Sequence, residues 1–345
     1  MKIALLSRYL PSGSKGGVGY QVHYLSNHLV KLGHEVTVYS MYEKPQDALY
    51  DVVKISINVY KKKFFRLFSF AHELRKQDFS NYDIVHSHGD DYLLSNLNIP
   101  ILRTFHGSAI AEAMHSKTFK LFLRQLILYP IEFLSAVRCD YSVGVSRNTK
   151  KCIPLIKGII PNGVDVQGFE SCDIPKSFNP TILFVGTIEG RKRGELLVKH
   201  FNEVIKPVIP EAELWMVSDK EVNGKGIINF GKVNTEKLIT LFKSSWIFCL
   251  PSSYEGFGVP YIEAMAAGSA VVATPNMGAK EILQDGYYGI LTEEHALGNM
   301  IVKLIEEPEL RNSLINKGKA NVQSYNWDKI SNKYLELYKN LIKNL

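Results

Sequence analysis

The sequence has few cysteines and no long apolar run. Its cysteines, Cys139, Cys152, Cys172 and Cys249, show neither Cys-x-x-Cys pairing nor the spacing of a metal site. We therefore interpret them as free thiols in a reducing cytoplasm. No apolar stretch reaches the roughly 18–20 residues that a membrane-spanning helix requires, and the chain starts without a signal-peptide pattern. These absences predict a cytoplasmic protein that is soluble or peripheral, at most at the inner face of the cell membrane.

Two motifs that would indicate other chemistry are incomplete. The run Gly16-Gly17-Val18-Gly19 lacks the third glycine of a G-x-G-x-x-G fingerprint, so a nicotinamide-linked oxidoreductase is only a weak reading. His86 and His88 have the spacing of a ligand pair but lack a third partner. We therefore predict no metal site.

The chain is long enough for two domains and apolar enough to give each a core. It has 345 residues, of which 46% are hydrophobic and 22% charged. Residues 1–165 carry 21 Lys and Arg against 13 Asp and Glu, a net charge of +8, and the remainder carries 20 against 21, a net charge of −1. The basic first part suits an anionic partner such as a lipid-phosphate acceptor or a membrane surface. A well-solvated basic surface with no partner is an equally good interpretation.

Strand and helix signals alternate in the first part of the chain. A buried strand over residues 2–7 precedes a helix over about residues 20–32, which Gly33 ends, and a strand over residues 35–39 follows. This order is a βαβ unit. Its repetition predicts a doubly wound α/β domain with further strands over residues 84–87, 101–105, 141–145 and 158–160.

The second part of the chain repeats this organisation. It begins with a strand over residues 181–185 and a helix near residues 195–205. Further strands are predicted over residues 214–217, 227–230 and 246–250, and a helix near residues 235–244. Two successive α/β domains are therefore predicted, joined by the Pro- and Gly-containing stretch around residues 161–180.

Residues 251–274 are the most informative segment. Glu255 and Glu263 enclose seven residues around a Gly-rich turn that opens into a helix, with Pro260 at its first position and Gly268 as its stop. A buried strand over residues 270–272 follows. The backbone N–H groups of residues 256–259 would face an anion at the helix N-terminus, where the helix dipole also favours negative charge. Two carboxylates beside a phosphate-accepting turn suit a ligand that also carries hydroxyls, such as a sugar nucleotide.

The segment Glu255-Gly-Phe-Gly-Val-Pro-Tyr-Ile-Glu263 resembles the signature of retaining GT-B glycosyltransferases, closest to glycosyltransferase family 4 (glycosyl transferases group 1). Five more segments follow the family's order and, with this one, span nearly the whole chain: Gly16-Gly17-Val18-Gly19, Thr104-Phe105-His106-Gly107, Val145-Ser146, Pro161-Asn162-Gly163-Val164-Asp165 and Phe184-Val185-Gly186.

The resemblance implies a fold and a reaction. The GT-B fold has two Rossmann-like doubly wound parallel-sheet domains that face a central cleft. Residues 1–165 would form the acceptor-side domain and residues 166–326 the nucleotide-sugar-binding domain, with a helix over residues 327–345 crossing back to the first. The implied reaction moves a hexose-type sugar, with retention, from a UDP- or GDP-type donor to a hydroxyl acceptor. That acceptor is expected to be a lipid-linked glycan or a surface polysaccharide intermediate. The donor is a co-substrate, and neither a cofactor nor a metal is expected.

A leaving diphosphate needs cations, and the basic turn that follows Gly186 offers them. Thr187 stands where the family usually has an Arg, whereas Lys192 aligns with the family's Lys. We therefore expect Lys192 to pair with phosphate oxygens, with Arg191 as the compensating cation. Without its place after Gly186, this turn would be interpreted as a solvated basic loop.

The acidic residues and one histidine complete the expected catalytic set. The resemblance implies that Glu263 accepts hydrogen bonds from the ribose hydroxyls, and the alternative is a carboxylate that only complements the helix dipole. Glu255 would contact the donor sugar's hydroxyls or stabilise its developing positive charge, unless it is an ordinary loop acid. His106 would lie near the donor sugar, with a structural histidine as the alternative.

Several glycines and backbone groups are expected to bind the donor. Glycines in the first loop would allow its backbone close to the ligand. Asn162 is expected to shape the linker, and Asp90-Asp91 is not the Asp-x-Asp metal motif of the other main glycosyltransferase fold. The donor-binding set is Gly16, Gly17, Gly186, Phe257, Gly258, Val259 and, for the nucleobase, Val233.

Two segments could place the basic domain on an anionic membrane. Lys61-Lys62-Lys63-Phe64-Phe65-Arg66 interleaves cations with aromatic residues, and residues 117–134 are rich in Phe, Leu and Ile, with Lys120 and Arg124 inserted. For the second segment a buried core helix is a slightly better interpretation. No recognised nucleic-acid-binding module is present, so nucleic acid is not an expected partner.

A hypothesis of another class remains open alongside the enzyme. A catalytically silent nucleotide-sugar-binding subunit of a polysaccharide assembly complex would bind the donor without turning it over. The presence of Glu255, Glu263, Lys192 and His106 together favours the enzyme.

Overall fold

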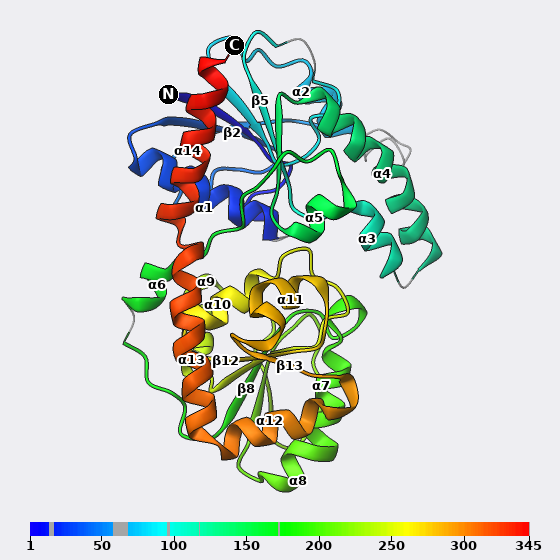
Figure 1. Cartoon of the computed structure of the whole chain (residues 1–345), viewed down its shortest axis with the longest axis vertical. Coiled ribbons are helices and arrows are strands. Elements are labelled where there is room, and N and C mark those ends of the chain that lie inside the picture. The colour runs from blue at the N-terminus through cyan, green and yellow to red at the C-terminus, as the bar shows by residue number, and fades with distance from the viewer. Residues whose placement is uncertain (14–16, 58–67, 95–96, 117, 172, 345) are drawn as a thin grey trace. The chain divides into compact units, whose positions relative to one another are not determined.

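The computed structural model describes the whole chain except residues 14–16, 58–67, 95–96, 117, 172 and 345. The chain divides into two compact units (Figure 1). The N-terminal unit comprises Met1–Met114, Lys120–Gly163 and Trp327–Leu345, and the C-terminal unit comprises His115–Phe119 and Val164–Asn326. The chain thus passes between the units at Gly163, two residues before the expected boundary.

The N-terminal unit is built on a seven-stranded parallel sheet of order β3-β2-β1-β4-β5-β6-β7. Its central strands are almost entirely buried because both faces of a parallel sheet are covered by other elements. Two strands begin and end where they were predicted, β4 and β5. The strands are β1 (Lys2–Leu6), β2 (Glu35–Ser40), β3 (Asp51–Lys54), β4 (Ile84–Ser87), β5 (Ile101–Phe105), β6 (Tyr141–Gly144) and β7 (Gly158–Ile159).

The helices of this unit include one that starts earlier than predicted. Helix α1 begins at Gly17, three residues ahead of the expected start, and Gly33 follows its end with the positive φ of 83° that favours glycine. The helices are α1 (Gly17–Lys31), α2 (Ser69–Leu74), α3 (Ala109–Met114), α4 (Phe119–Arg138), α5 (Arg147–Cys152) and α14 (Trp327–Lys343).

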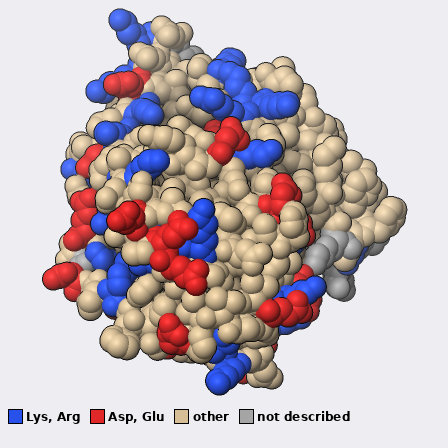
Figure 2. All heavy atoms as spheres, turned by 60° about the horizontal axis from the view of Figure 1, so that its bottom comes forward, with Lys and Arg blue, Asp and Glu red and all other residues tan. Residues whose placement is uncertain are grey.

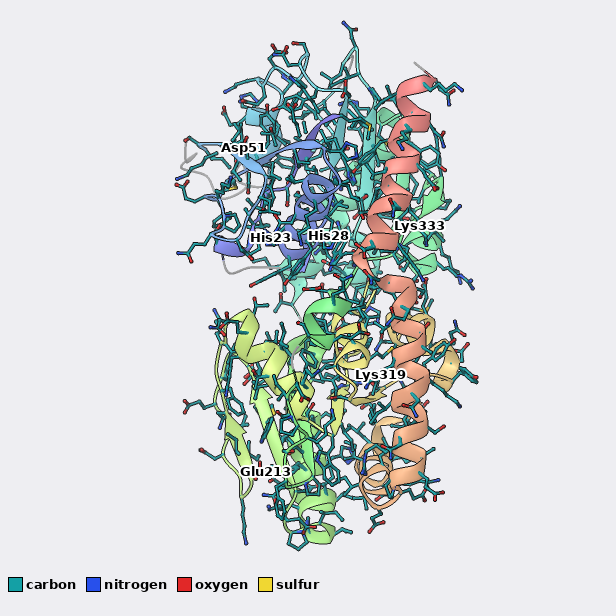
Figure 3. All side chains as sticks on the ribbon, turned by 90° about the vertical axis from the view of Figure 1, so that its left-hand side faces the viewer. His23, His28, Asp51, Glu213, Lys319 and Lys333 are labelled. Carbon is teal, nitrogen blue, oxygen red and sulfur yellow. The ribbon has the colours of Figure 1, made fainter. Side chains whose placement is uncertain are left out.

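Helix α14 belongs to the N-terminal unit although the chain reaches it last. Trp327 is buried and stacks with the ring of His28 on α1 at a centroid distance of 5.8 Å; Figure 3 labels His28 beside this helix. Further along, the hydroxyl of Tyr338 lies 2.6 Å from Nδ1 of His86 on β4. The last helix is thus part of the core that carries the central strands.

The C-terminal unit repeats the plan with a six-stranded parallel sheet of order β10-β9-β8-β11-β12-β13. Its strands are β8 (Thr181–Val185), β9 (Glu213–Val217), β10 (Ile227–Asn229), β11 (Ile247–Leu250), β12 (Ala270–Ala273) and β13 (Ile290–Leu291). Its helices are α6 (Val166–Glu170), α7 (Gly194–His200), α8 (Lys206–Val208), α9 (Thr235–Ser244), α10 (Val259–Ala266), α11 (Met277–Leu283), α12 (Leu297–Glu306) and α13 (Pro308–Val322). The two parallel sheets confirm the predicted α/β organisation.

Candidate active site

The Gly-rich turn between β11 and α10 has the conformation that its sequence predicts. Gly258 caps α10 with φ of 102°, and a Cβ there would lie 2.4 Å from the Tyr261 ring, so only glycine fits. Pro260 is the second helical residue rather than the first, and Gly268 follows the end of α10 with φ of 72°. The amino-terminal end of α10 therefore opens where the glutamate-containing turn ends.

The cations and carboxylate expected to be catalytic come together at this turn. Nζ of Lys192 lies 2.7 Å from Oε1 of Glu255, and a guanidinium nitrogen of Arg191 lies 2.9 Å from the same oxygen. The side chain of Glu255 is only 6% exposed, whereas that of Arg191 is 43% exposed. One buried carboxylate thus holds two cations from a loop 63 residues earlier in the chain.

Burial and charge act against each other in this pair. Burial of the Glu255 carboxyl favours its neutral form, but the charges of Lys192 and Arg191 outweigh burial and hold its pKa below the ordinary value. Burial lowers the pKa of Lys192, and Glu255 only partly offsets this. The pair is therefore held in its charged form by mutual contact.

Glu263 differs in electrostatic state from Glu255. It lies on α10, and burial raises the pKa of its carboxyl to about 7, although the charge of Lys192 acts in the opposite direction. The residue as a whole is half-buried, but the raised pKa is caused by burial of its carboxyl group, which is less hydrated than the rest of the residue. A carboxyl poised near neutral pH can be shifted to its charged form by hydrogen bonds from a ligand.

The loop after β8 is shaped to bring Lys192 to the site. A Cβ at Gly186 would lie 3.1 Å from both Cβ and Cγ of Lys192, so the glycine makes room for the lysine stem. Arg193 has the left-handed φ of 53° and ties the loop to the ends of β11 and β12. Its guanidinium donates to the Pro251 carbonyl at 2.6 Å and to Oγ1 of Thr274 at 2.9 Å.

Three residues that support the turn were not among the predicted site residues. A Cβ at Gly278 would lie 2.6 Å from the Phe257 carbonyl and 2.8 Å from Cβ of Glu255, so α11 can approach the turn only with glycine there. Asn276 caps α11 and donates to the Ser252 carbonyl at 3.0 Å. The signal that could have identified Asn276 is its place between a strand and a helix, where Asn is a preferred N-cap. The role of Arg193 had no local signal.

The remaining expected donor-binding residues of the C-terminal unit lie at the same edge of its sheet. Val233 follows β10 just ahead of α9, as residues 186–192 follow β8 and residues 251–258 follow β11. The Phe257 ring is buried against Tyr325, so only its backbone and those of Gly258 and Val259 are candidates for contact. Thr187 donates to the Glu189 carbonyl at 2.8 Å and supplies no cation in place of the family's Arg.

The expected residues of the N-terminal unit are a histidine and two loop glycines. His106 follows β5, and its Nε2 lies 2.8 Å from Nδ1 of His88, with the side chain of Asn162 as a second hydrogen-bond partner. Burial lowers the pKa of His106 to about 3, with the charge of Arg103 acting in the same direction, so the imidazole is neutral. Gly17 is exposed at the start of α1 with open space around it, and Gly16 lies outside the described residues, as does the segment 61–66.

The part of the chain that the structure describes contains neither a metal-binding cluster nor a membrane-spanning helix. There, no three His, Cys, Asp or Glu side chains are grouped so that they could hold a metal ion. No helix in these residues is both long and apolar enough to cross a membrane. A reaction without a metal remains a prediction.

Comparisons with known proteins agree with this geometry. Residues 175–321 match the family "Glycosyl transferases group 1", and residues 15–167 match "Glycosyltransferase Family 4". The phosphatidyl-myo-inositol mannosyltransferase of Mycobacterium tuberculosis is 26% identical over 75% of this chain and 74% of its own length.

Two solved structures share the fold over nearly all of both chains. Sucrose-phosphate synthase from Thermosynechococcus elongatus has a TM-score of 0.82 and 19% identity, covering 100% of each chain. HepE from Anabaena, in complex with UDP-glucose, has a TM-score of 0.77 and 16% identity, covering 99% of this chain and 100% of its own.

The fold and the family matches define the class first: this is a GT-B protein with two parallel-sheet α/β domains. The chain belongs to the glycosyltransferases of the group 1 and family 4 type, since the two matches fall on different parts of the chain and together cover most of it. The resemblance found in the sequence is thereby confirmed, and it replaces the weak interpretation of the chain as a nicotinamide-linked oxidoreductase.

Proposed function

We propose that this glycosyltransferase moves a hexose-type sugar from a nucleotide-diphosphate sugar to a hydroxyl acceptor with retention of anomeric configuration. The observation that carries the proposal is the grouping of Lys192, Arg191 and Glu255 at the amino-terminal turn of α10. Two cations and a helix N-terminus at one place suit a leaving diphosphate.

The diphosphate would draw the cations away from Glu255. In the ligand-free site Lys192 and Arg191 both neutralise one carboxylate. Phosphate oxygens that pair with these cations would release Glu255 to contact the sugar's hydroxyls or its developing positive charge. Donor binding would thus switch the buried carboxylate from a structural ion pair to a catalytic role.

The other residues would hold the donor in place. Glu263 would accept hydrogen bonds from the ribose hydroxyls, and the backbone of residues 257–259 with Gly186 would line the phosphates. Val233 would contact the nucleobase through its backbone. In the N-terminal unit, His106 would act as a neutral hydrogen-bonding group toward a sugar hydroxyl, and Gly17 would let the backbone at the start of α1 come close to a ligand.

We assign the donor to the UDP or GDP type and the acceptor to a lipid-linked glycan or surface polysaccharide intermediate. Two similar proteins support these assignments: one is a phosphatidyl-myo-inositol mannosyltransferase, and another is solved with UDP-glucose. The acceptor would bind the basic first part of the chain. The reaction would need neither a metal nor a cofactor, and it would take place in the cytoplasm, at the inner face of the membrane.

The test is nucleoside-diphosphate release from a panel of UDP-, GDP-, ADP- and dTDP-sugars, with EDTA present and no acceptor. We expect slow hydrolysis of one donor. NMR should show that the sugar is initially released with the anomeric configuration that it had in the donor. Release of the opposite anomer would contradict retention, and dependence on a divalent cation would contradict a metal-free reaction.

The same panel separates the enzyme from the binding subunit. One outcome would be no nucleoside-diphosphate release from any donor, with or without a lipid extract as acceptor, together with thermal stabilisation by one nucleotide. That outcome would contradict the proposed enzyme and favour a catalytically silent donor-binding subunit.

A further inference from the structure

Helix α4 of the N-terminal unit exposes a continuous apolar side. Leu123, Leu126, Pro130, Leu134 and Val137 are exposed and recur every three or four residues, so they form one stripe along the helix, which we name the α4 ridge. Val137 is 69% exposed, and Phe119, one turn before Leu123, is 79% exposed. Of the whole helix only Ser135 and Ala136 are buried, so the interpretation of this segment as a buried core helix is wrong.

The outward direction of the ridge is fixed by polar contacts on the opposite side of α4. Glu132 accepts a hydrogen bond from the backbone N–H of Ala109 with both carboxylate oxygens at 3.0 Å. The Ser135 hydroxyl donates to Asp91 at 2.5 Å. Figure 1 shows α4 at the edge of the N-terminal unit, away from the sheet. The apolar side chains therefore cannot turn inward without breaking these bonds, and a contiguous exposed apolar surface of this kind marks an interaction site.

The charges beside the ridge have one sign. Lys120 and Arg124 are exposed on one flank of α4, and Arg138 on the same flank donates a hydrogen bond to the Tyr92 carbonyl. The only acidic residue of the helix is Glu132, which lies on the opposite side in contact with Ala109. On the face drawn in Figure 2, acidic and basic side chains are interspersed. An apolar stripe bordered only by cations complements an anionic, apolar surface.

We propose that the α4 ridge lies on an anionic lipid bilayer, parallel to its surface, with its apolar side chains at the boundary between headgroups and acyl chains. A helix of this kind, with bulky apolar residues on one side and Lys or Arg beside them, lies in the interface instead of spanning it. The cations would contact lipid phosphates. A protruding ridge about 20 Å long enters a fluid surface without needing a preformed groove in a partner. The proposal rests on α4 alone and not on the reaction.

The test is co-sedimentation of the full chain with vesicles of phosphatidylcholine containing phosphatidylglycerol, compared with vesicles of phosphatidylcholine alone. The ridge variant is Leu123→Gln/Leu126→Gln/Leu134→Gln. Its matched control is Leu32→Gln/Leu49→Gln/Leu155→Gln, which changes three leucines of similar exposure elsewhere on the same unit. We expect the wild type and the control to bind the anionic vesicles and the ridge variant to bind at least about tenfold more weakly.

A second variant separates charge from apolar contact. Lys120→Gln/Arg124→Gln should weaken binding roughly 30-fold at low salt and less at high salt. The control Lys31→Gln/Lys333→Gln removes two exposed cations from other helices and should have little effect. For each variant, the thermal transition and donor hydrolysis report whether the chain is folded, independently of lipid binding.

A direct readout does not depend on loss of binding. A tryptophan introduced by Leu123→Trp should be quenched by brominated lipids in anionic vesicles. The proposal is overturned by absence of binding to anionic vesicles, by equal binding of the ridge variant and its control, or by an unquenched Leu123→Trp variant. It is also overturned if the wild type self-associates without lipid and the ridge variant does not, since the ridge would then bind a second copy.

Discussion

Both units place buried titratable side chains at the carboxyl ends of parallel strands, but in different charge states. In the C-terminal unit, Lys192 and Glu255 are charged and neutralise each other. In the N-terminal unit, the rings of the buried His88 and the half-buried His106 are stacked, and desolvation lowers the pKa of each imidazole well below its ordinary value. Neutral imidazoles recognise hydroxyls by hydrogen bonds. Cations that are paired with a carboxylate can exchange it for an anionic group of a ligand.

The difference suggests how one fold divides its work between two halves. A diphosphate requires cations that are available but not permanently occupied by solvent, and the buried Glu255 holds them in place until the ligand arrives. A neutral sugar or acceptor requires groups that carry no charge to desolvate. The four predictions below test this division, starting with the largest expected effect.

The largest effect is expected from the charged pair. Glu255→Gln and Lys192→Ala should each lower turnover roughly 100- to 1000-fold, because stabilisation of developing charge is lost. Turnover is measured on the donor found in the panel, with circular dichroism to verify folding. Glu189→Gln, on the same loop but exposed and paired with Lys220, is the matched control and should keep its rate. Wild-type rates in both purified variants would contradict the assignment.

The second prediction separates the units by stability. Trp327→Ala should cost about 3–5 kcal/mol, because it empties a buried site against α1 and Gly163. Hydrogen exchange followed by peptide should show β1, β4 and β5 losing protection while β8 and β11 change less. Leu337→Ala, a partly buried position on the same helix, should have a smaller effect. Equal loss of protection in both units would show that they unfold as one.

The third prediction concerns the pH dependence of nucleotide binding. The pKa of Glu263 is about 7 in the empty site, so the neutral form dominates below that pH. Hydrogen bonds from ribose hydroxyls favour the carboxylate, so binding should release a proton and affinity should rise as pH increases through about 7. Calorimetry of nucleoside diphosphate binding at several pH values measures this dependence of affinity on pH. Glu263→Gln should remove the part that is due to Glu263 and leave the part that is due to ionisation of the ligand's phosphates. An unchanged slope in the variant would contradict the ribose contact.

The smallest effect is expected from His106, whose replacement should lower turnover modestly and leave the pH profile unchanged. His106→Gln should lower turnover by roughly tenfold, about the contribution of one hydrogen bond. Because the pKa of His106 is about 3, its imidazole stays neutral throughout neutral and mildly acidic pH. The pH profile of the variant should therefore keep the wild-type shape. Loss of an ionisation near pH 6–7 in the variant would show that His106 titrates in the working enzyme.

Local sequence patterns predicted most of the strands and the helix at the site. The bounds of β4, β5 and β8 were predicted correctly, since each strand contains consecutive apolar residues of the kind found in buried parallel strands. The short edge strands β3 and β13 were not predicted, because their few residues are only partly buried and show no clear period. The other two edge strands, β7 and β10, were predicted, so a position at the edge does not by itself remove the sequence signal.

Helix α4 shows what an apolar pattern leaves open. Its composition predicted a helix, and both a buried and a membrane-bound helix agreed with it. Apolar periodicity reports which side chains share a side but not what that side contacts. The hydrogen bonds of Glu132 and Ser135 decided that the apolar side faces outward.

By itself the sequence determined the local features of the site, namely the glycine turn before α10, the stop at Gly268 and the chemical types of the charged residues. These follow from backbone conformations that depend on neighbouring residues. Tertiary structure alone decided that Lys192 and Glu255 share one ion pair and that Glu263 is poised near neutral pH. The reason is the strand order: β8 pairs with β11, so the loops that follow them meet across 63 residues of chain.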